Sequence, residues 1–164
     1  MKFKFKINSK EYFIRMLVVI LAAVSPLVLL ITHGYLPSLS SYWRTEWQPL
    51  FIITNAVTSY YLYSIKNWKI SALTLLLLTA FSVELFPITH NILAGVFFIV
   101  NIYPFWATKH YRYLLWFYLS SLVALTFSMF IAEIIAIETM CIYHGLMLRR
   151  IYKFSTENSL GSGK

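Results

Sequence analysis

The stretch that decides the fold is YLLWFYLSSLVALTFSMFIAEIIAIETMCIYHGLML, residues 113–148, an apolar run broken only by Glu133, Glu138 and His144. A bilayer core about 30 Å thick is crossed by about 20 apolar residues in a helix. As one helix the stretch would be about 54 Å long, at about 1.5 Å per residue, which far exceeds one bilayer. We therefore expect two spans joined by a tight turn near residues 128–133, although no Gly or Pro marks it.

The composition of the whole chain indicates the same class. Of its 164 residues, 59% are hydrophobic and 12% are charged, and the mean hydropathy is +0.67. A soluble domain carries about 25% charged residues, and a small domain buries only about two-thirds of its surface. These values exclude soluble and disordered classes, and a single cysteine, Cys141, excludes a disulfide framework. We expect an all-α integral membrane protein.

Further apolar runs precede this stretch and are separated by short connections that contain polar residues or proline. We expect a compact six-helix transmembrane bundle with short loops, forming one domain over residues 1–154. Residues 155–164 are small and polar, a composition typical of a disordered tail. The spans are expected at about residues 12–32, 49–65, 70–86, 91–106, 113–130 and 133–152.

The basic residues decide between five and six spans, because cytoplasmic loops carry an excess of Lys and Arg. With six spans every basic stretch lies on one side of the membrane, and only Arg44 lies opposite. With five spans Arg149, Arg150 and Lys153 would be translocated. We therefore expect six spans with both termini in the cytoplasm, in a plasma or inner membrane. This topology accounts for the net charge of +8, so nucleic acid is not an expected partner.

The cations near the two ends of the chain form a candidate surface for anionic lipid headgroups, at about 1 kcal/mol for each charge. A cytoplasmic protein or RNA could use the same surface, and topology alone would also account for the charges. The residues are Lys2, Lys4, Lys6, Lys10, Arg149, Arg150 and Lys153.

The tryptophans lie near the expected span boundaries, where amphipathic rings prefer the membrane interface. We therefore expect these rings to mark the interfaces on both sides of the bundle. They are Trp43, Trp47, Trp68, Trp106 and Trp116.

In the six-span arrangement a set of polar residues collects at the outer side of the bundle. Ionisable residues inside a membrane are functional candidates, because their burial is expensive. We expect an outward-facing pocket, capped by the first loop, that binds a lipid or a membrane partner. Its candidate residues are Ser38, Ser40, Gln48, Asn55, Glu84, His90, Asn91 and Glu138. The alternative is that Glu84, His90 and Glu133 are helix-end residues wetted by interfacial water. His144 is interpreted as an interfacial or packing residue.

Two other classes of function stay open. A membrane-embedded lipid hydrolase or acyltransferase would need a metal site or an activated nucleophile. The chain has no aspartate, no His-x-x-x-His and no Glu-x-x-His pattern, so we expect no catalytic residue, metal or cofactor. An oligomeric membrane pore would use the polar patch of the second span, although such residues more often hydrogen-bond neighbouring helices. The patch consists of Thr54, Asn55, Thr58 and Ser59.

The first loop carries a resemblance to a known family. Residues 35–55 contain Leu-Pro-Ser-Leu-Ser at 36–40, Gln-Pro-Leu-Phe at 48–51, and then Asn55. This segment resembles the first loop of the DRAM-type membrane proteins, the damage-regulated autophagy modulator and FGF-receptor-activating-protein family.

A second segment, residues 84–98 with His90 near the start of a span, resembles the fourth span of the same family. Glu138 falls where the family carries a glutamate in its last span. The chain departs from the pattern at two positions, because Thr139 follows where tryptophan is usual and Ile131 stands where a histidine is expected.

The resemblance implies six spans, both termini in the cytoplasm, and a role in membrane-lipid or membrane-trafficking processes without a well-established catalytic mechanism. It also implies that His90, Glu138 and the loop of residues 38–40 form the outer-face site. We expect a non-enzymatic multi-pass accessory protein that binds membrane lipids, or a membrane or cytoplasmic protein. Assembly of the chain into a homo-oligomer stays open.

Overall fold

The computed structural model describes the backbone of residues 7–161 and the side chains of residues 7–157. Over this range the regular structure is helical and has no strand, which confirms the all-α part of the expected class. Its α-helices are α1 (Ser9–His33), α2 (Gln48–Tyr63), α3 (Lys69–Ala80), α4 (Pro87–Val100), α5 (Ile102–Ala107), α6 (Tyr113–Ala124) and α7 (Met129–Gly161). Short 3-10 helices lie between them: η1 (Leu39–Arg44), η2 (Lys66–Trp68) and η3 (Lys109–Tyr111).

The break that charge predicted within residues 113–148 is present. α6 ends at Ala124, a turn follows, and α7 begins at Met129. The local signal is Ser128, whose hydroxyl accepts a hydrogen bond from the backbone N–H of Ile131 at 3.3 Å. A serine in this position satisfies one of the free N–H groups at the start of a helix. The turn therefore lies a few residues earlier than expected.

Two other boundaries differ from expectation. The fourth expected span, residues 91–106, is divided at Asn101 into α4 and α5, so the described range holds seven α-helices and not six. α7 is longer than expected and stays helical through residues 155–161, which composition had assigned to a disordered tail. Residues 162–164 of that tail lie outside the described range.

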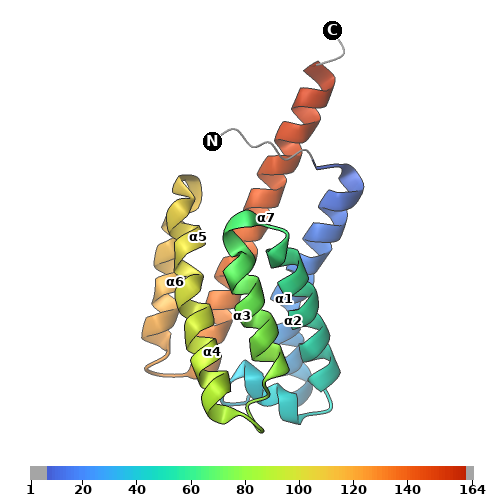
Figure 1. The fold of residues 1–164 in the computed structure, drawn as a ribbon. Coiled ribbons are helices and arrows are strands. Elements are labelled where there is room, and N and C mark those ends of the chain that lie inside the picture. Colours follow the sequence, from blue (N-terminus) through green and yellow to red (C-terminus); the bar gives the residue numbers. More distant parts are fainter. Residues whose placement is uncertain (1–6, 162–164) are drawn as a thin grey trace.

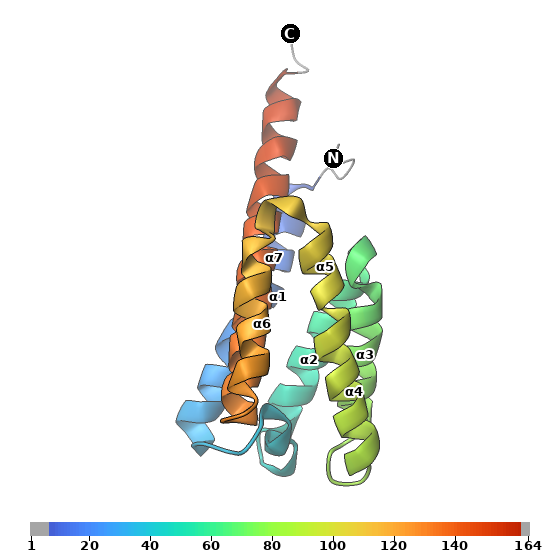
Figure 2. The same ribbon diagram turned by 90° about the vertical axis from the view of Figure 1, so that its left-hand side faces the viewer.

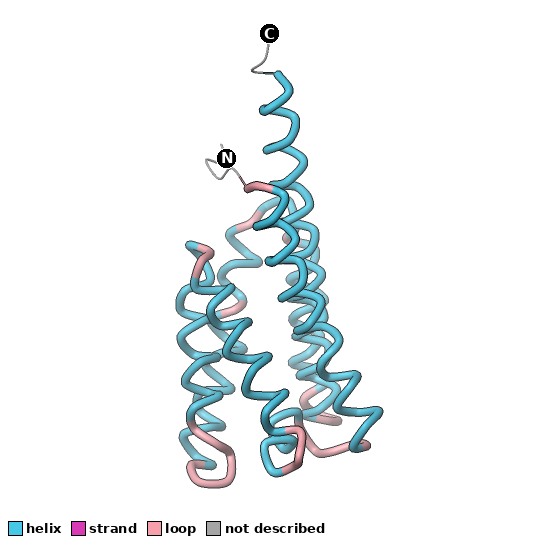
Figure 3. The backbone as a smooth tube through the Cα atoms, turned by 90° about the vertical axis from the view of Figure 1, so that its right-hand side faces the viewer, coloured by secondary structure: helices cyan, strands magenta, loops and turns pink. Residues whose placement is uncertain are grey.

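The helices pack as neighbours in a fixed order. α1 contacts α2 and α7, α3 lies between α2 and α4, and α6 lies against α7. All loops fall at the two ends of the bundle (Figure 3). In Figure 2, α3 and α4 stand apart from α6 and α7 near the end that holds η1, whereas α5 meets α6 at the opposite end. We call the end with η1 the loop end, and the end where α1 begins and α7 finishes the terminal end.

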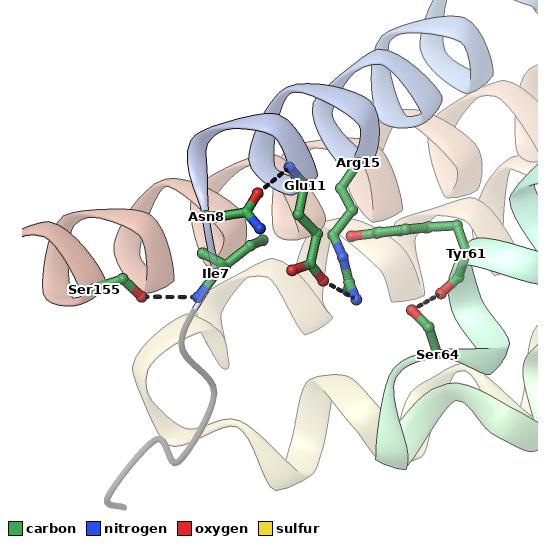
Figure 4. Close-up of polar contacts among 7 residues, drawn as sticks. All are labelled: Ile7, Asn8, Glu11, Arg15, Tyr61, Ser64 and Ser155. Carbon is green, nitrogen blue, oxygen red and sulfur yellow. Dashed lines mark hydrogen bonds and ion pairs between the residues drawn. The ribbon is translucent and has the colours of Figure 1, made fainter.

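Contacts between the first and last helices hold the terminal end together (Figure 4). The backbone N–H of Ile7 donates to the hydroxyl of Ser155 at 3.1 Å. One turn away, the rings of Tyr12 and Tyr152 stack with their centroids 4.4 Å apart. Asn8 caps α1 by accepting from the N–H of Glu11 at 2.8 Å, which fixes where the helix starts. The start of α1 and the last turns of α7 therefore lie side by side.

Three helical stretches are long and apolar enough to cross a membrane: Ser9–His33, Pro87–Ala107 and Met129–Glu157. α6 is a shorter apolar helix. Large apolar side chains point outward, including Ile31 at 82% exposure, Trp116 at 73% and Phe127 at 85%. An apolar surface of this extent marks a membrane or protein contact.

The interior at the terminal end is aromatic. Trp68, Phe105 and Tyr143 are fully buried or nearly so and contact one another, with ring centroids 5.1 to 5.7 Å apart. Tyr118 joins the cluster from α6 and donates to the carbonyl of Phe98 at 3.0 Å. Trp68, which was expected to mark an interface, is only 1% exposed, so its ring lies in the core of the bundle at this end.

Candidate functional site

A cavity of about 120 Å³ lies among α1, α2, α3, α4 and α7. Along α7 its wall runs from Glu133 near the loop end to His144 near the terminal end. Eleven helical residues span about 16 Å, so the cavity is long and narrow. Its volume is close to that of the ~150 Å³ apolar cavity that holds benzene in an engineered protein.

The wall is mostly apolar because α1, α3, α4 and α7 each turn a mainly apolar stripe inward. α7 contributes Glu133, Ala136, Met140 and His144, and residues three or four apart lie on the same face of a helix. α3 and α4 supply only aliphatic and phenylalanine side chains. They are Leu75, Leu78, Ala94, Phe97 and Phe98.

At the loop end the cavity meets a polar cap. The backbone N–H of Leu39 in η1 donates to Oε2 of Glu133 at 2.6 Å, which joins the first loop to α7. The hydroxyls of Ser38 and Ser40 lie 2.9 Å apart, and Ser40 lines the cavity. Tyr42 fixes the loop by donating to the carbonyl of Gly34 at 2.6 Å. Burial raises the pKa of this phenol, so it stays protonated and able to donate.

α2 supplies the polar part of the wall. Thr54, Asn55 and Thr58 all line the cavity. Thr54 is 5% exposed, and its hydroxyl has no hydrogen-bond partner among the described residues. A buried hydroxyl without a partner costs about 1–3 kcal/mol. Three of the four residues of the patch that could have lined an oligomeric pore therefore line a cavity within one chain.

His144 is the polar group at the terminal end of the cavity, and it is 3% exposed. Its Nδ1 lies 3.2 Å from the hydroxyl of Tyr61. The rings of Trp68 and Tyr143 hold the imidazole with centroids at 4.5 and 5.2 Å. Its Nε2 has no partner in the described part of the chain. The ring is thus fixed in place with one nitrogen still free to bond.

Only two of the residues predicted for the pocket line this cavity, Ser40 and Asn55. Ser38 lies beside Ser40 in the cap and also bonds Ser41 at 2.9 Å. Gln48 is half-buried at the start of α2 and does not reach the wall.

The remaining predicted pocket residues are not brought together. Nδ1 of His90 donates to the carbonyl of Phe81 at 2.7 Å, so this buried ring braces the turn between α3 and α4. Glu84 and Asn91 are exposed beside that turn. Glu138 is half-buried on α7 outside the cavity wall, and its Oε1 is buried without a partner among residues 7–157.

The predicted basic surface is described only in part, because Lys2, Lys4 and Lys6 lie outside the described residues. Lys10 is exposed in the first turn of α1. The cations of α7 line a groove at the terminal end, next to η3. The basic residues of this groove are His110, Arg149, Arg150 and Lys153.

Sequence reasoning did not select Glu133 and His144 for the pocket. The signal that could have found them is their spacing, because eleven residues bring a helix back to nearly the same face after three turns. Ala136 and Met140 lie between them on that face.

Within residues 7–157 no three His, Cys, Asp or Glu side chains are grouped so that they could hold a metal ion. Comparisons with protein families, curated proteins and solved structures find no match to this chain.

Proposed function

We propose that this chain is a non-enzymatic, multi-pass membrane protein that holds one slender apolar chain, such as a lipid acyl chain, in the cavity between its helices. The observation that carries the proposal is the cavity itself, with its apolar walls and the free polar atoms of Thr54 and His144. Apolar pockets with a few fixed polar groups are typical of small-molecule sites.

The membrane part of the proposal draws on length, charge and topology. Three helical stretches have the length and hydropathy of a span. α1 begins and α7 finishes at the same end of the bundle (Figure 1), which an even number of crossings requires. Apart from Arg44 in η1, every described Lys and Arg belongs to the terminal end. They are Lys10, Arg15, Lys66, Lys69, Lys109, Arg112, Arg149, Arg150 and Lys153. The positive-inside rule supports an arrangement of six crossings with this end in the cytoplasm.

The shape and chemistry of the cavity favour a chain-like ligand. A narrow cavity about 16 Å long matches a single extended chain better than a bulky ring system. The free atoms, Oγ1 of Thr54 and Nε2 of His144, would bond to a polar group of the ligand or to a water held with it, since buried polar atoms are normally paired.

A bound ligand is favoured over an oligomeric pore because Thr54 and Asn55 face the inside of one chain. The aromatic cluster of Trp68, Phe105 and Tyr143 fills the bundle beyond His144. A role as an accessory protein of membrane-lipid processes, which the DRAM-type resemblance implies, stays a prediction.

Native mass spectrometry of the full chain in mild detergent tests the proposal. We expect one lipid or added long-chain amphiphile to stay bound. The Ala136→Phe variant should lose it, because Ala136 lines the cavity and a phenyl ring would fill the space. Ile142→Phe is the matched control, since Ile142 is 52% exposed on the same helix and is not part of the wall. Equal occupancy in both variants would contradict a ligand in this cavity.

A further inference from the structure

We propose that the ligand carries a cationic amine, which sits at the loop end of the cavity and pairs with the carboxylate of Glu133. This inference deepens the proposed function and rests on it, because it names the headgroup of the molecule whose chain fills the cavity. The argument starts from the surroundings of Glu133.

Glu133 combines an apolar setting with an unbalanced charge. It lines the cavity beside Ile137 and Leu39, and its carboxylate accepts a hydrogen bond from the N–H of Leu39. The ion pairs of the described residues join Glu11 to Arg15 and Lys153 to Glu157, both at the terminal end. No Lys or Arg in the described range therefore neutralises Glu133.

An ionised carboxylate in such a place is stabilised by a positive partner, which the described part of the chain does not supply. Removing a charge from water costs several kcal/mol unless an opposite charge and further hydrogen bonds compensate it. The Leu39 N–H supplies one hydrogen bond but no charge. Among headgroups, a primary ammonium supplies both a positive charge and three donors.

The neighbouring groups suit the remaining donors of an ammonium. Ser40 lines the same end of the cavity and is 9% exposed. Its hydroxyl oxygen and that of Ser38 can accept hydrogen bonds. The apolar wall of α3 and α4 then receives the chain attached to the amine. The headgroup thus lies under η1 and the chain points toward His144.

The other groups of the cavity do not offer this chemistry. His144 is held by Tyr61 and aromatic rings at the far end. Thr54 is neutral, and the remaining polar side chain of α7 on the wall is the thiol of Cys141, which is only a weak hydrogen-bonding group. Glu138 lies outside the wall on the same helix, which makes it a matched control for the charge of Glu133.

The test compares three dodecyl amphiphiles of equal chain length: dodecylamine, dodecanol and dodecanoate. Occupancy of the full chain is measured by native mass spectrometry at equal mole fractions in one detergent. We expect dodecylamine to bind about tenfold more tightly than dodecanol, since a hydrogen bond to a charged group is worth about 1.4 kcal/mol more than a neutral one. Dodecanoate should bind most weakly.

The Glu133→Gln variant should lower dodecylamine binding to the level of dodecanol and leave dodecanol unchanged. Glu138→Gln should preserve the preference for the amine. Equal binding of amine and alcohol by the unaltered chain overturns the headgroup assignment, and that comparison needs no variant. In that case, a loss of dodecanol occupancy in the Ala136→Phe variant would still support the proposed cavity. Failure of all three amphiphiles to bind would overturn both proposals.

Discussion

The hydroxyl of Tyr61 on α2 lies 3.2 Å from Nδ1 of His144 on α7, across 83 residues of sequence. This contact ties together two walls of the cavity and sets the orientation of the imidazole. His144 lines the cavity, and its Nε2 is buried without a partner among the described residues. The hydrogen bond between Tyr61 and His144 therefore contributes both to the stability of the bundle and to the orientation of the His144 ring at the cavity.

Replacing Tyr61 with Phe should destabilise the protein by about 1–3 kcal/mol, because Nδ1 of His144 would lose its partner in a buried place. Thermal unfolding in detergent measures the effect. Tyr60→Phe is the control, since Tyr60 is the neighbouring tyrosine and is 81% exposed. An equal shift in both variants would mean that the hydrogen bond contributes nothing.

Thr54→Val should leave the empty protein as stable as before or slightly more stable. The change keeps the shape of the side chain and removes a buried hydroxyl that has no partner among the described residues. Thermal unfolding with and without saturating dodecanol measures the stability of the ligand-bound and the empty protein separately. A loss of stability without ligand would show that the hydroxyl has a partner in the empty protein.

His90→Ala should lower stability by about 1–2 kcal/mol and leave ligand occupancy unchanged. His90 bonds the carbonyl of Phe81 and does not line the cavity. Unfolding and native mass spectrometry on the same sample measure both effects. Asn91→Ala, an exposed neighbour, should change neither. A loss of ligand occupancy in the His90→Ala variant without a loss of stability would mean that His90 belongs to the binding site.

Cysteine labelling in intact cells should place the two ends of the bundle on opposite sides of the membrane. After Cys141, the single cysteine, is replaced with Ala, Glu46→Cys near η1 should react with a membrane-impermeant maleimide. Glu157→Cys should react only after permeabilisation, since basic segments stay in the cytoplasm. External labelling at both positions would require an even number of crossings between them and would contradict the six-span topology, which places five there.

Neutralising Arg149, Arg150 and Lys153 together with Gln should weaken enrichment of anionic lipid around the protein. Each charge near a negatively charged surface contributes about 1 kcal/mol. Co-purification of phosphatidylglycerol against phosphatidylcholine from mixed vesicles measures the change. Arg44→Gln at the loop end serves as the control. Unchanged enrichment would mean that the groove next to η3 does not select headgroups.

The helices could be predicted because long apolar runs leave few alternatives in a membrane. The turn before α7 followed from the length of the apolar run and from the positions of the charges. No Gly or Pro marks this turn, and Ser128 supplies the capping signal. The helical extension over residues 155–161 was not predictable from polarity, since the contact of Ser155 with Ile7 stabilises that end from far away in sequence.

The cavity could not be read from the sequence, because it depends on which face each of five helices turns inward. Depth in the membrane was used to group Glu84, His90 and Glu138, yet residues at equal depth can face different neighbours. His90 turned to a carbonyl nine residues earlier, and Glu138 lies off the stripe that holds Glu133 and His144. Trp68 shows the same limit, since a ring near a boundary can also point into the core.

The bond from Ile7 to Ser155 spans 148 residues, and this has a consequence for biosynthesis. α1 leaves the ribosome long before α7, although α7 is one of the two helices that α1 packs against. During translation the Tyr12 face of α1 therefore stays uncovered until α7 has been made, and only then can this contact form. A chain truncated before α7 would leave the Tyr12 face of α1 exposed, and quality-control proteases could then recognise it.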